Sequence, residues 1–233
     1  MQIAFLTPRP ATRPQIPGGA IVCGRWPGEF LPGCRGYDIR PARTPHQQRA
    51  AASLVRRMYS WRGYSTESPG RRTDEAHRIT LAAWQDDEVV ATLTVGRDSP
   101  AGLLGDALYS EEIDRLRRGE RVICEVSRLA VDPDFSSRDL LTTLFRVAHR
   151  YAQSAFGATD AVIEVNPRHA RYYERQFGFR RLGGVKQCPR VDAPAVLLHQ
   201  RLDALAIPDL ATDWAECSND LMFFPPSSVF DER

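Results

Sequence analysis

Apolar positions along the chain change their spacing several times, and each change predicts a new element of secondary structure. A short strand over 37–40 precedes a helix over 45–59, whose first turn Thr44 can cap. Two β-like segments over 77–84 and 89–95 flank a polar turn and predict a hairpin. The first half of this regular region is therefore predicted to run strand, helix, strand, strand.

The second half alternates helical and β-like periods. The predicted elements are a polar helix over 111–118, a strand over 121–131, a helix over 138–156 capped by Ser136 or Ser137, a strand over 161–165, a helix over 166–176, and strands over 178–185 and 193–200. A hairpin followed by alternating strands and helices indicates an α/β (α+β) fold. We expect one mixed central sheet of about seven strands, with helices on both faces.

Composition divides the chain into three parts. Residues 1–36 are rich in proline, glycine and arginine, which predicts an extended arm. Residues 37–202 hold the regular elements and form the predicted domain. Residues 203–233 form a mixed tail, whose apolar patch at 221–224 is expected to pack against that domain.

Charge, hydropathy and cysteine content exclude several classes of protein. The formal net charge of +2 argues against a dedicated nucleic-acid binder. No apolar run approaches the ~20 residues of a transmembrane helix, and Met1–Pro10 lacks the basic start and long apolar core of a signal peptide. The five cysteines form no C-x-x-C pair. We therefore predict reduced thiols, no metal site and a cytoplasmic protein.

Several motifs resemble those of the GNAT superfamily of acyltransferases. Residues 37–42 look like the opening strand of these enzymes, and 172–179 look like their closing helix with its Gly-Phe exit. Between them, Cys-Glu-Val-Ser-Arg-Leu-Ala-Val at 124–131 resembles a strand of acyl-homoserine-lactone synthases, and more closely that of N-acyl amino acid synthases. Stretches at 102–117 and 166–169 match the same layout. The resemblance implies the GNAT fold with a splayed central strand.

The resemblance also implies N-acyl transfer from a thioester to an amine. The backbone of Leu129, Ala130 and Val131 is expected to bind the pantetheine arm of the donor beside the splayed strand. Glu125 is the candidate base, or the group that orients the acceptor ammonium, and Arg128 is the candidate clamp for an acceptor carboxylate. The structural alternatives are a solvent-facing or salt-bridged glutamate and an internal arginine ion pair.

The spacing of these two residues makes a geometric prediction. Residues three apart on a regular strand face opposite sides of the sheet. Glu125 and Arg128 can share a site only if a bulge intervenes, so we predict a β-bulge between residues 125 and 131. Cys124 alternates away from Glu125, which argues against a nucleophilic role.

The helix over 166–176 supplies further candidates. Tyr173, with Tyr172 beside it, is expected to protonate the leaving sulfur, and core packing is the alternative. Asn166 either bonds the backbone of the cleft or caps this helix.

The turn before the helix over 138–156 bears on the donor. GNAT enzymes that use coenzyme A carry a glycine-rich turn there for the pyrophosphate, whereas residues 135–140 contain no glycine and include Asp139. We therefore predict an acyl carrier protein thioester as the donor, with acyl-CoA less favoured and no tightly bound cofactor. Arg138, Arg146 and Arg150 are expected to dock the acidic carrier.

The acceptor is inferred from a motif in which this chain differs from acyl-homoserine-lactone synthases. Acyl-homoserine-lactone synthases carry Asp-x-x-Asp before the first hairpin, where this chain has Asp74 and His77. Our first hypothesis is therefore transfer of a medium or long acyl chain to the amine of an amino acid or similar small acceptor. The alternatives are an acyl-homoserine-lactone synthase and a catalytically silent GNAT-like module that binds acyl carriers or other proteins.

Overall fold

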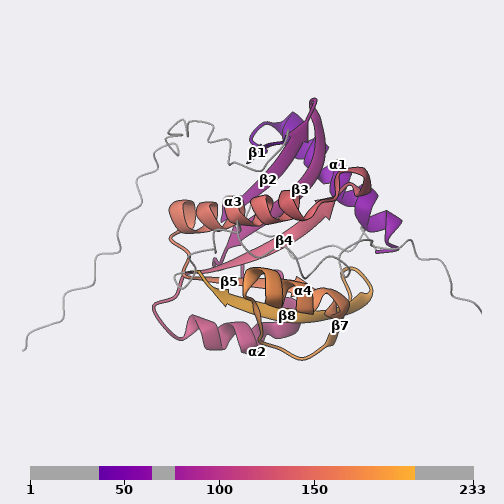
Figure 1. Cartoon of the computed structure of the whole chain (residues 1–233). Coiled ribbons are helices and arrows are strands. Elements are labelled where there is room, and N and C mark those ends of the chain that lie inside the picture. The colour runs from indigo at the N-terminus through magenta and orange to yellow at the C-terminus, as the bar shows by residue number, and fades with distance from the viewer. Residues whose placement is uncertain (1–36, 65–76, 203–233) are drawn as a thin grey trace, which may run out of the picture. The chain divides into compact units, whose positions relative to one another are not determined.

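The computed structural model describes residues 37–64 and 77–202 (Figure 1). The predicted arm over 1–36, the segment 65–76 and the predicted tail over 203–233 lie outside the described residues. All strands and helices predicted from the sequence fall within the described part.

Eight strands of the described chain form the sheet. They are β1 (Asp38–Pro41), β2 (Arg78–Gln85), β3 (Glu88–Arg97), β4 (Ile123–Val131), β5 (Asp160–Val165), β6 (Arg180–Arg181), β7 (Lys186–Cys188) and β8 (Ala193–Arg201). Their order is β1-β2-β3-β4-β5-β8-β6, and β7 pairs with β8. Only β4 and β5 among these pairs are parallel, so the sheet is mixed, as predicted.

Four α-helices lie in the described ranges, together with a 3₁₀ helix at Pro133–Phe135. They are α1 (Pro45–Trp61), α2 (Asp106–Arg117), α3 (Arg138–Phe156) and α4 (Pro167–Phe177). Thr44 and Gln47 form a capping box at α1. Ser137 caps α3, and Gly157 ends that helix with a left-handed φ of 62°, so its predicted bounds are confirmed. Within this part of the chain, no helix is both long and apolar enough to cross a membrane.

The helix α2 begins earlier than the predicted 111–118. The carboxylate of Asp106 accepts the N–H of Leu103 at 2.7 Å and bonds Arg117, in the last turn, at 2.8 Å. These bonds stabilise a first turn that the apolar spacing alone does not indicate.

The prediction of one strand over 178–185 is wrong, because this segment holds only the two-residue strand β6, and β7 begins after it, at Lys186. A Cβ atom on Gly183 would lie 2.6 Å from the ring of Tyr109, and the Tyr109 hydroxyl bonds the C=O of Gly184 at 2.9 Å. The chain therefore leaves the sheet at the two glycines to pack over a buried tyrosine of α2.

The two faces of the sheet carry different helices (Figure 1). Ile123 of β4 packs with α2, and Ala130 of the same strand packs with α1. Cys124 and Val126, which alternate with Ile123, belong to the larger core that also contains α3 and α4. We call these the α1/α2 face and the α3/α4 face.

The strands β4 and β5 separate part-way along their length. Their pairing ends at Val126 and Ile163, although β4 continues to Val131 and β5 to Val165. Over the last residues of β4 the opposite edge stays paired with β3, so only the edge toward β5 is left open. This gap is the splay that the sequence resemblance implies.

Candidate active site

A β-bulge interrupts β4 within the recognised motif. The register with β3 shifts between Ser127 and Ala130, so that Arg128 and Leu129 stand opposite a single residue. Arg128 takes a left-handed φ of 52°, and its C=O accepts a hydrogen bond from the Thr92 hydroxyl at 3.0 Å. The predicted bulge is thus confirmed, and it changes which side chains of β4 share a face.

Glu125 lies on the α1/α2 face and is only 3% exposed. Its Oε2 accepts the N–H of Leu104 at 2.9 Å, and its Oε1 accepts the N–H of Gly105 at 2.7 Å. Burial raises the pKa of this carboxyl, and the two backbone hydrogen bonds oppose the shift. The hollow beside it measures about 10 Å³, which is room for about one water molecule. Both carboxylate oxygens are therefore bonded to the loop that begins α2.

Arg128 is exposed, and its charge is within electrostatic reach of Tyr59 in α1. Burial raises the pKa of the Tyr59 phenol in α1, and the charge of Arg128 opposes that shift. No ion pair joins Glu125 to Arg128 in the described part of the chain, because the Glu125 oxygens bond backbone N–H groups instead. Arg128 thus lies within the bulge itself, and its side chain forms no ion pair with Glu125 in the described ranges.

The sequence prediction misses another largely buried carboxylate near the splay, Glu164 of β5. Its Oε1 accepts Nη2 of Arg190 at 2.7 Å, and Nη1 of the same arginine donates to the C=O of Leu104 at 2.8 Å. The Glu164 side chain is 11% exposed, and its Oε2 has no hydrogen-bond partner in residues 37–64 and 77–202. A signal was present, since this is a lone charge among the apolar residues 161–165, where burial of an acid is rare.

Tyr173 and Tyr172 occupy different environments on α4. Tyr173 is 9% exposed and packs edge-on against Phe145 and Phe179, and burial raises its pKa. The hydroxyl of Tyr172 is buried without a hydrogen-bond partner in the described part. Burial raises its pKa to about 12, and Arg138 opposes that shift. Core packing thus accounts for Tyr173, whereas Tyr172 has a hydroxyl with bonding capacity to spare.

Asn166 and Arg138 stand at the helix starts nearest the splay. The Oδ1 of Asn166 accepts the N–H of Arg168 at 3.2 Å and caps α4. Arg138 is the first residue of α3, within electrostatic reach of Tyr172. The backbone of Leu129–Val131 borders the same opening from β4.

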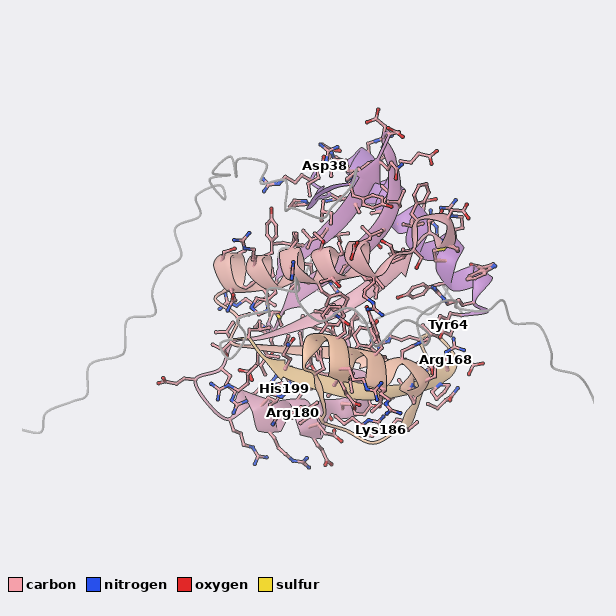
Figure 2. The ribbon with its side chains drawn as sticks, in the orientation of Figure 1. Asp38, Tyr64, Arg168, Arg180, Lys186 and His199 are labelled. Atoms are coloured by element: carbon pink, nitrogen blue, oxygen red, sulfur yellow. The ribbon has the colours of Figure 1, made fainter. Side chains whose placement is uncertain are left out.

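The end of α1 meets the start of α4 beside this opening. Burial lowers the pKa of the Arg62 guanidinium, Tyr64 opposes that shift and Arg168 adds to it. Figure 2 shows Tyr64 and Arg168 on the same side of the molecule. The surroundings of the splay are therefore aromatic and cationic.

An apolar cavity of about 200 Å³ lies on the α3/α4 face. Its wall includes Val126, the last residue of β4 that pairs with β5, so the cavity reaches the apex of the splay. Phe145 and Phe177 stack with their ring centroids 4.3 Å apart in the same wall. A cavity of about 150 Å³ holds a benzene molecule, so this one has room for several methylene groups.

The cysteines near the site are not placed as nucleophiles. Cys124 lines the apolar cavity, and burial raises its pKa to about 12, which keeps the thiol protonated at neutral pH. Burial and the neighbouring Glu164 also raise the pKa of the Cys188 thiol. Across the described ranges, no group of three or more His, Cys, Asp or Glu side chains could hold a metal ion.

The start of α3 offers little to a phosphate. Ser137 Oγ already accepts the N–H of Leu140 at 3.1 Å, and Asp139 lies in the first turn. Asp132, in the preceding turn, accepts the N–H of Asp134 at 3.1 Å. Filled N–H groups and nearby carboxylates weaken the anion site that a helix start otherwise provides.

Known proteins share both sequence and fold with this chain. The family model described as N-acyl amino acid synthase FeeM matches residues 50–201. The structure of FeeM, an N-acyl amino acid synthase from uncultured soil microbes, covers 72% of this chain and 93% of that chain, with a TM-score of 0.67 and 23% identity. The match to a putative N-acetyltransferase from Lactobacillus plantarum covers 72% of this chain and 99% of that chain, with a TM-score of 0.54 and 19% identity. The match to the AHL synthase LasI covers 71% of this chain and 90% of that chain, with a TM-score of 0.50 and 14% identity. No curated protein sequence matches significantly.

The splayed mixed sheet and its helix order are the GNAT fold, and the chain is an acyltransferase of that superfamily. The match covers more than half of the chain's 233 residues. The chain therefore belongs to the N-acyl amino acid synthase FeeM family, which confirms the recognition made from the 124–131 motif.

Proposed function

We propose that this acyltransferase moves a medium or long acyl chain from an acyl carrier protein thioester to the amine of an amino acid. The observation that carries the proposal is the contrast between the two sides of the splay. The α3/α4 side holds an apolar cavity, and the α1/α2 side holds Glu125, Glu164 and Arg190. A thioester bound in the gap would place its alkyl chain on one side and meet a polar acceptor on the other.

The donor arm fits the open edge of β4. Unpaired N–H and C=O groups of Leu129–Val131 would bond the amides of a pantetheine arm, as an added strand does. The capped and acidic start of α3 disfavours a coenzyme A pyrophosphate. A carrier protein needs no such phosphate cradle, and it is therefore the preferred donor.

The acceptor side of the splay also offers a cation for a carboxylate. Arg128 lies exposed beside the splay, and a guanidinium matches an amino acid carboxylate with two parallel hydrogen bonds. The backbone bonds of Glu125 favour a role in holding the 103–105 loop, and its predicted role as the base stays a prediction.

The leaving thiolate requires a proton. The Tyr172 hydroxyl is buried within electrostatic reach of Arg138, the first residue of α3, whereas Tyr173 is packed among aromatic rings. The hydroxyl without a partner supports Tyr172 as the donor of that proton, and the Tyr173 favoured by sequence stays the alternative.

The test incubates the full chain with acyl carrier thioesters or acyl-CoAs and a pool of amino acids, and follows thiol release and product mass. An N-acyl amino acid formed from the carrier thioester supports the proposal and names the acceptor. Turnover with CoA thioesters alone refutes the carrier assignment, and a lactone product from S-adenosylmethionine favours the homoserine-lactone alternative. No turnover with any donor and acceptor contradicts the proposed reaction.

A further inference from the structure

We infer that Glu164 removes the proton from the acceptor ammonium, the step that makes the amine nucleophilic. The inference rests on the proposed N-acyl transfer. It assigns the base to β5 and gives Glu125 of β4 a positioning role.

Glu164 stands at the apex of the splay. Pairing between β4 and β5 ends at Ile163, so the next residue borders the open gap. Val162, two residues before Glu164, packs with α2. The two-residue period of a strand therefore directs Glu164 to the α1/α2 face, where Glu125 also lies. The carboxylate is thus next to the gap in which a thioester carbonyl would bind.

The two carboxylates differ in their remaining bonding capacity. Each Glu125 oxygen already accepts a backbone N–H. Glu164 gives one oxygen to Arg190 at 2.7 Å, while its Oε2 is buried without a hydrogen bond in the described part of the chain. The Cys188 thiol, a weak donor, also lies beside this carboxylate. A buried acceptor atom left without a donor costs about 1–3 kcal/mol. An acceptor ammonium at Oε2 would supply the missing donor.

A chain of hydrogen bonds connects Glu125 to this base. Glu125 holds the N–H of Leu104, the C=O of Leu104 accepts Nη1 of Arg190, and Nη2 of Arg190 bonds Glu164. Arg190 therefore fixes the Glu164 carboxylate through Oε1 and leaves Oε2 without a hydrogen bond to the guanidinium. Glu125 acts through this chain, as a positioning residue.

The proposed step balances in protons and in electrons. The ammonium gives one proton to Oε2 of Glu164, and the nitrogen lone pair forms the C–N bond with the thioester carbon. The C–S bond breaks as the tetrahedral intermediate collapses, and a second proton from nitrogen passes to the thiolate through Tyr172 or solvent. Glu164 then releases its proton to water.

The test compares Glu164→Gln with two matched variants in the full chain. Glu112→Gln removes a carboxylate that also has one oxygen near a cation, 3.5 Å from Nζ of Lys186 (labelled in Figure 2), and one buried oxygen without a described partner. Glu112 belongs to α2 and has no place in the proposed site. Glu125→Gln tests the positioning role.

Two acceptors distinguish a base from a structural residue. One is the amino acid with the highest turnover in the pooled assay, whose amine is protonated at pH 7. The other is aminooxyacetate, which keeps a carboxylate but has a nitrogen that is unprotonated at pH 7. Glu164→Gln should lower kcat/KM for the amino acid by about 100-fold or more and lower that for aminooxyacetate by less than about fivefold. The loss with the amino acid should shrink toward pH 9.5. Glu112→Gln should change neither.

The other possible results would contradict the role of Glu164 as the base. Equal losses for both acceptors in Glu164→Gln, at every pH, would overturn the inference and leave a structural role. If Glu125→Gln, and not Glu164→Gln, shows the large loss with the amino acid and the small loss with aminooxyacetate, then Glu125 of β4 is the base. Unchanged turnover in Glu164→Gln would also overturn it. If the unsubstituted chain turns over no donor, the proposed function itself has failed, and a normal melting temperature for Glu164→Gln excludes misfolding as the cause of a loss.

Discussion

Residues with several partners fix the geometry on the α1/α2 face. Arg117 of α2 bonds the carboxylates of Asp98, Asp106 and Asp114 at 2.7–2.9 Å, and these hydrogen bonds raise the pKa of its guanidinium. They tie the end of β3 to both ends of α2. The loop that carries Leu104 and Gly105 lies between these points and is held in turn by Glu125.

Asp160 shows how such a buried charge sets a pH dependence. Its side chain is 2% exposed, and Arg121 and His199 (Figure 2) lie 3.0 and 2.7 Å from its Oδ1. Burial acts to raise its pKa, but hydrogen bonds from Thr159 and His199 and the charge of Arg121 bring it below the ordinary value. A depressed carboxyl pKa stabilises the fold above the unfolded pKa of about 4, and this contribution is lost as pH falls through the folded pKa.

We therefore expect Asp160→Asn to lower the free energy of unfolding by about 2 kcal/mol at pH 7. The difference from the unsubstituted chain should shrink as the pH falls below about 4. Urea unfolding across that range measures both. Asp38→Asn is the control, because its ion pair with Arg40 is exposed and contributes little. A difference that stays constant with pH would contradict the assignment.

Sequence reasoning at this scale succeeds where the cause is local. The bulge in β4 is predicted from the spacing of Glu125 and Arg128 within one strand. The partners of Glu125 are not local, because Leu104 and Gly105 come from a loop 20 or more residues away. The same holds for Glu164, whose partner Arg190 lies 26 residues further on.

Among the elements, α3 contributes part of the wall of the apolar cavity. Ala148 of this helix is 2% exposed and lines the cavity. A larger apolar side chain there would occupy space proposed for the end of the acyl chain. Because the cavity already exists, the substitution need not displace neighbouring core atoms.

We expect Ala148→Leu to shift the preferred donor toward chains several carbons shorter, with kcat/KM for the longest chain falling about tenfold. Rates with a series of saturated acyl thioesters measure the shift. Ala155→Leu on the exposed side of the same helix should leave the profile unchanged. An unaltered chain-length profile in Ala148→Leu would place the acyl chain elsewhere.

The elements also show which sequence signals suffice. The bounds of α3 are predicted correctly because a serine cap, an apolar stripe and a terminal glycine coincide. The strand over 178–185 fails as a prediction because Gly183 and Gly184 pack over Tyr109 of α2. That contact joins residues about 75 positions apart, which no local pattern reports.

We expect Gly183→Ala to destabilise the fold by about 2 kcal/mol or more, because the added Cβ would lie 2.6 Å from the buried ring of Tyr109. Gly184→Ala is the matched control, since a Cβ there meets no atom within 4 Å. Thermal unfolding of both variants measures the effect. Equal melting temperatures would contradict the close approach.

The whole molecule carries a near-balanced charge of +2, so an electrostatic partner must be recognised by a local surface. Arg138, Arg146 and Arg150 all belong to α3, which starts at the opening of the splay. A carrier protein that inserts its pantetheine arm there would lie against this helix, and its acidic surface would complement these cations.

Reversing these three charges to glutamate should weaken binding of the acyl carrier about tenfold or more, and the effect should diminish at high salt. Surface binding measurements at two ionic strengths would show both. Arg118→Glu, an exposed residue after α2, is the control. Carrier affinity that withstands the triple reversal would rule out docking on α3.

The pairing of β4 and β5 ends part-way along the sheet, and this has a kinetic consequence. A donor bound along β4 and an acceptor bound beside Glu164 would occupy separate entrances, so neither must leave before the other arrives. Direct transfer within a ternary complex then needs no acylated protein intermediate, in keeping with the protonated, buried thiol of Cys124. Double-reciprocal plots of the initial rate against one substrate, at several concentrations of the other, would therefore give intersecting lines and not parallel ones.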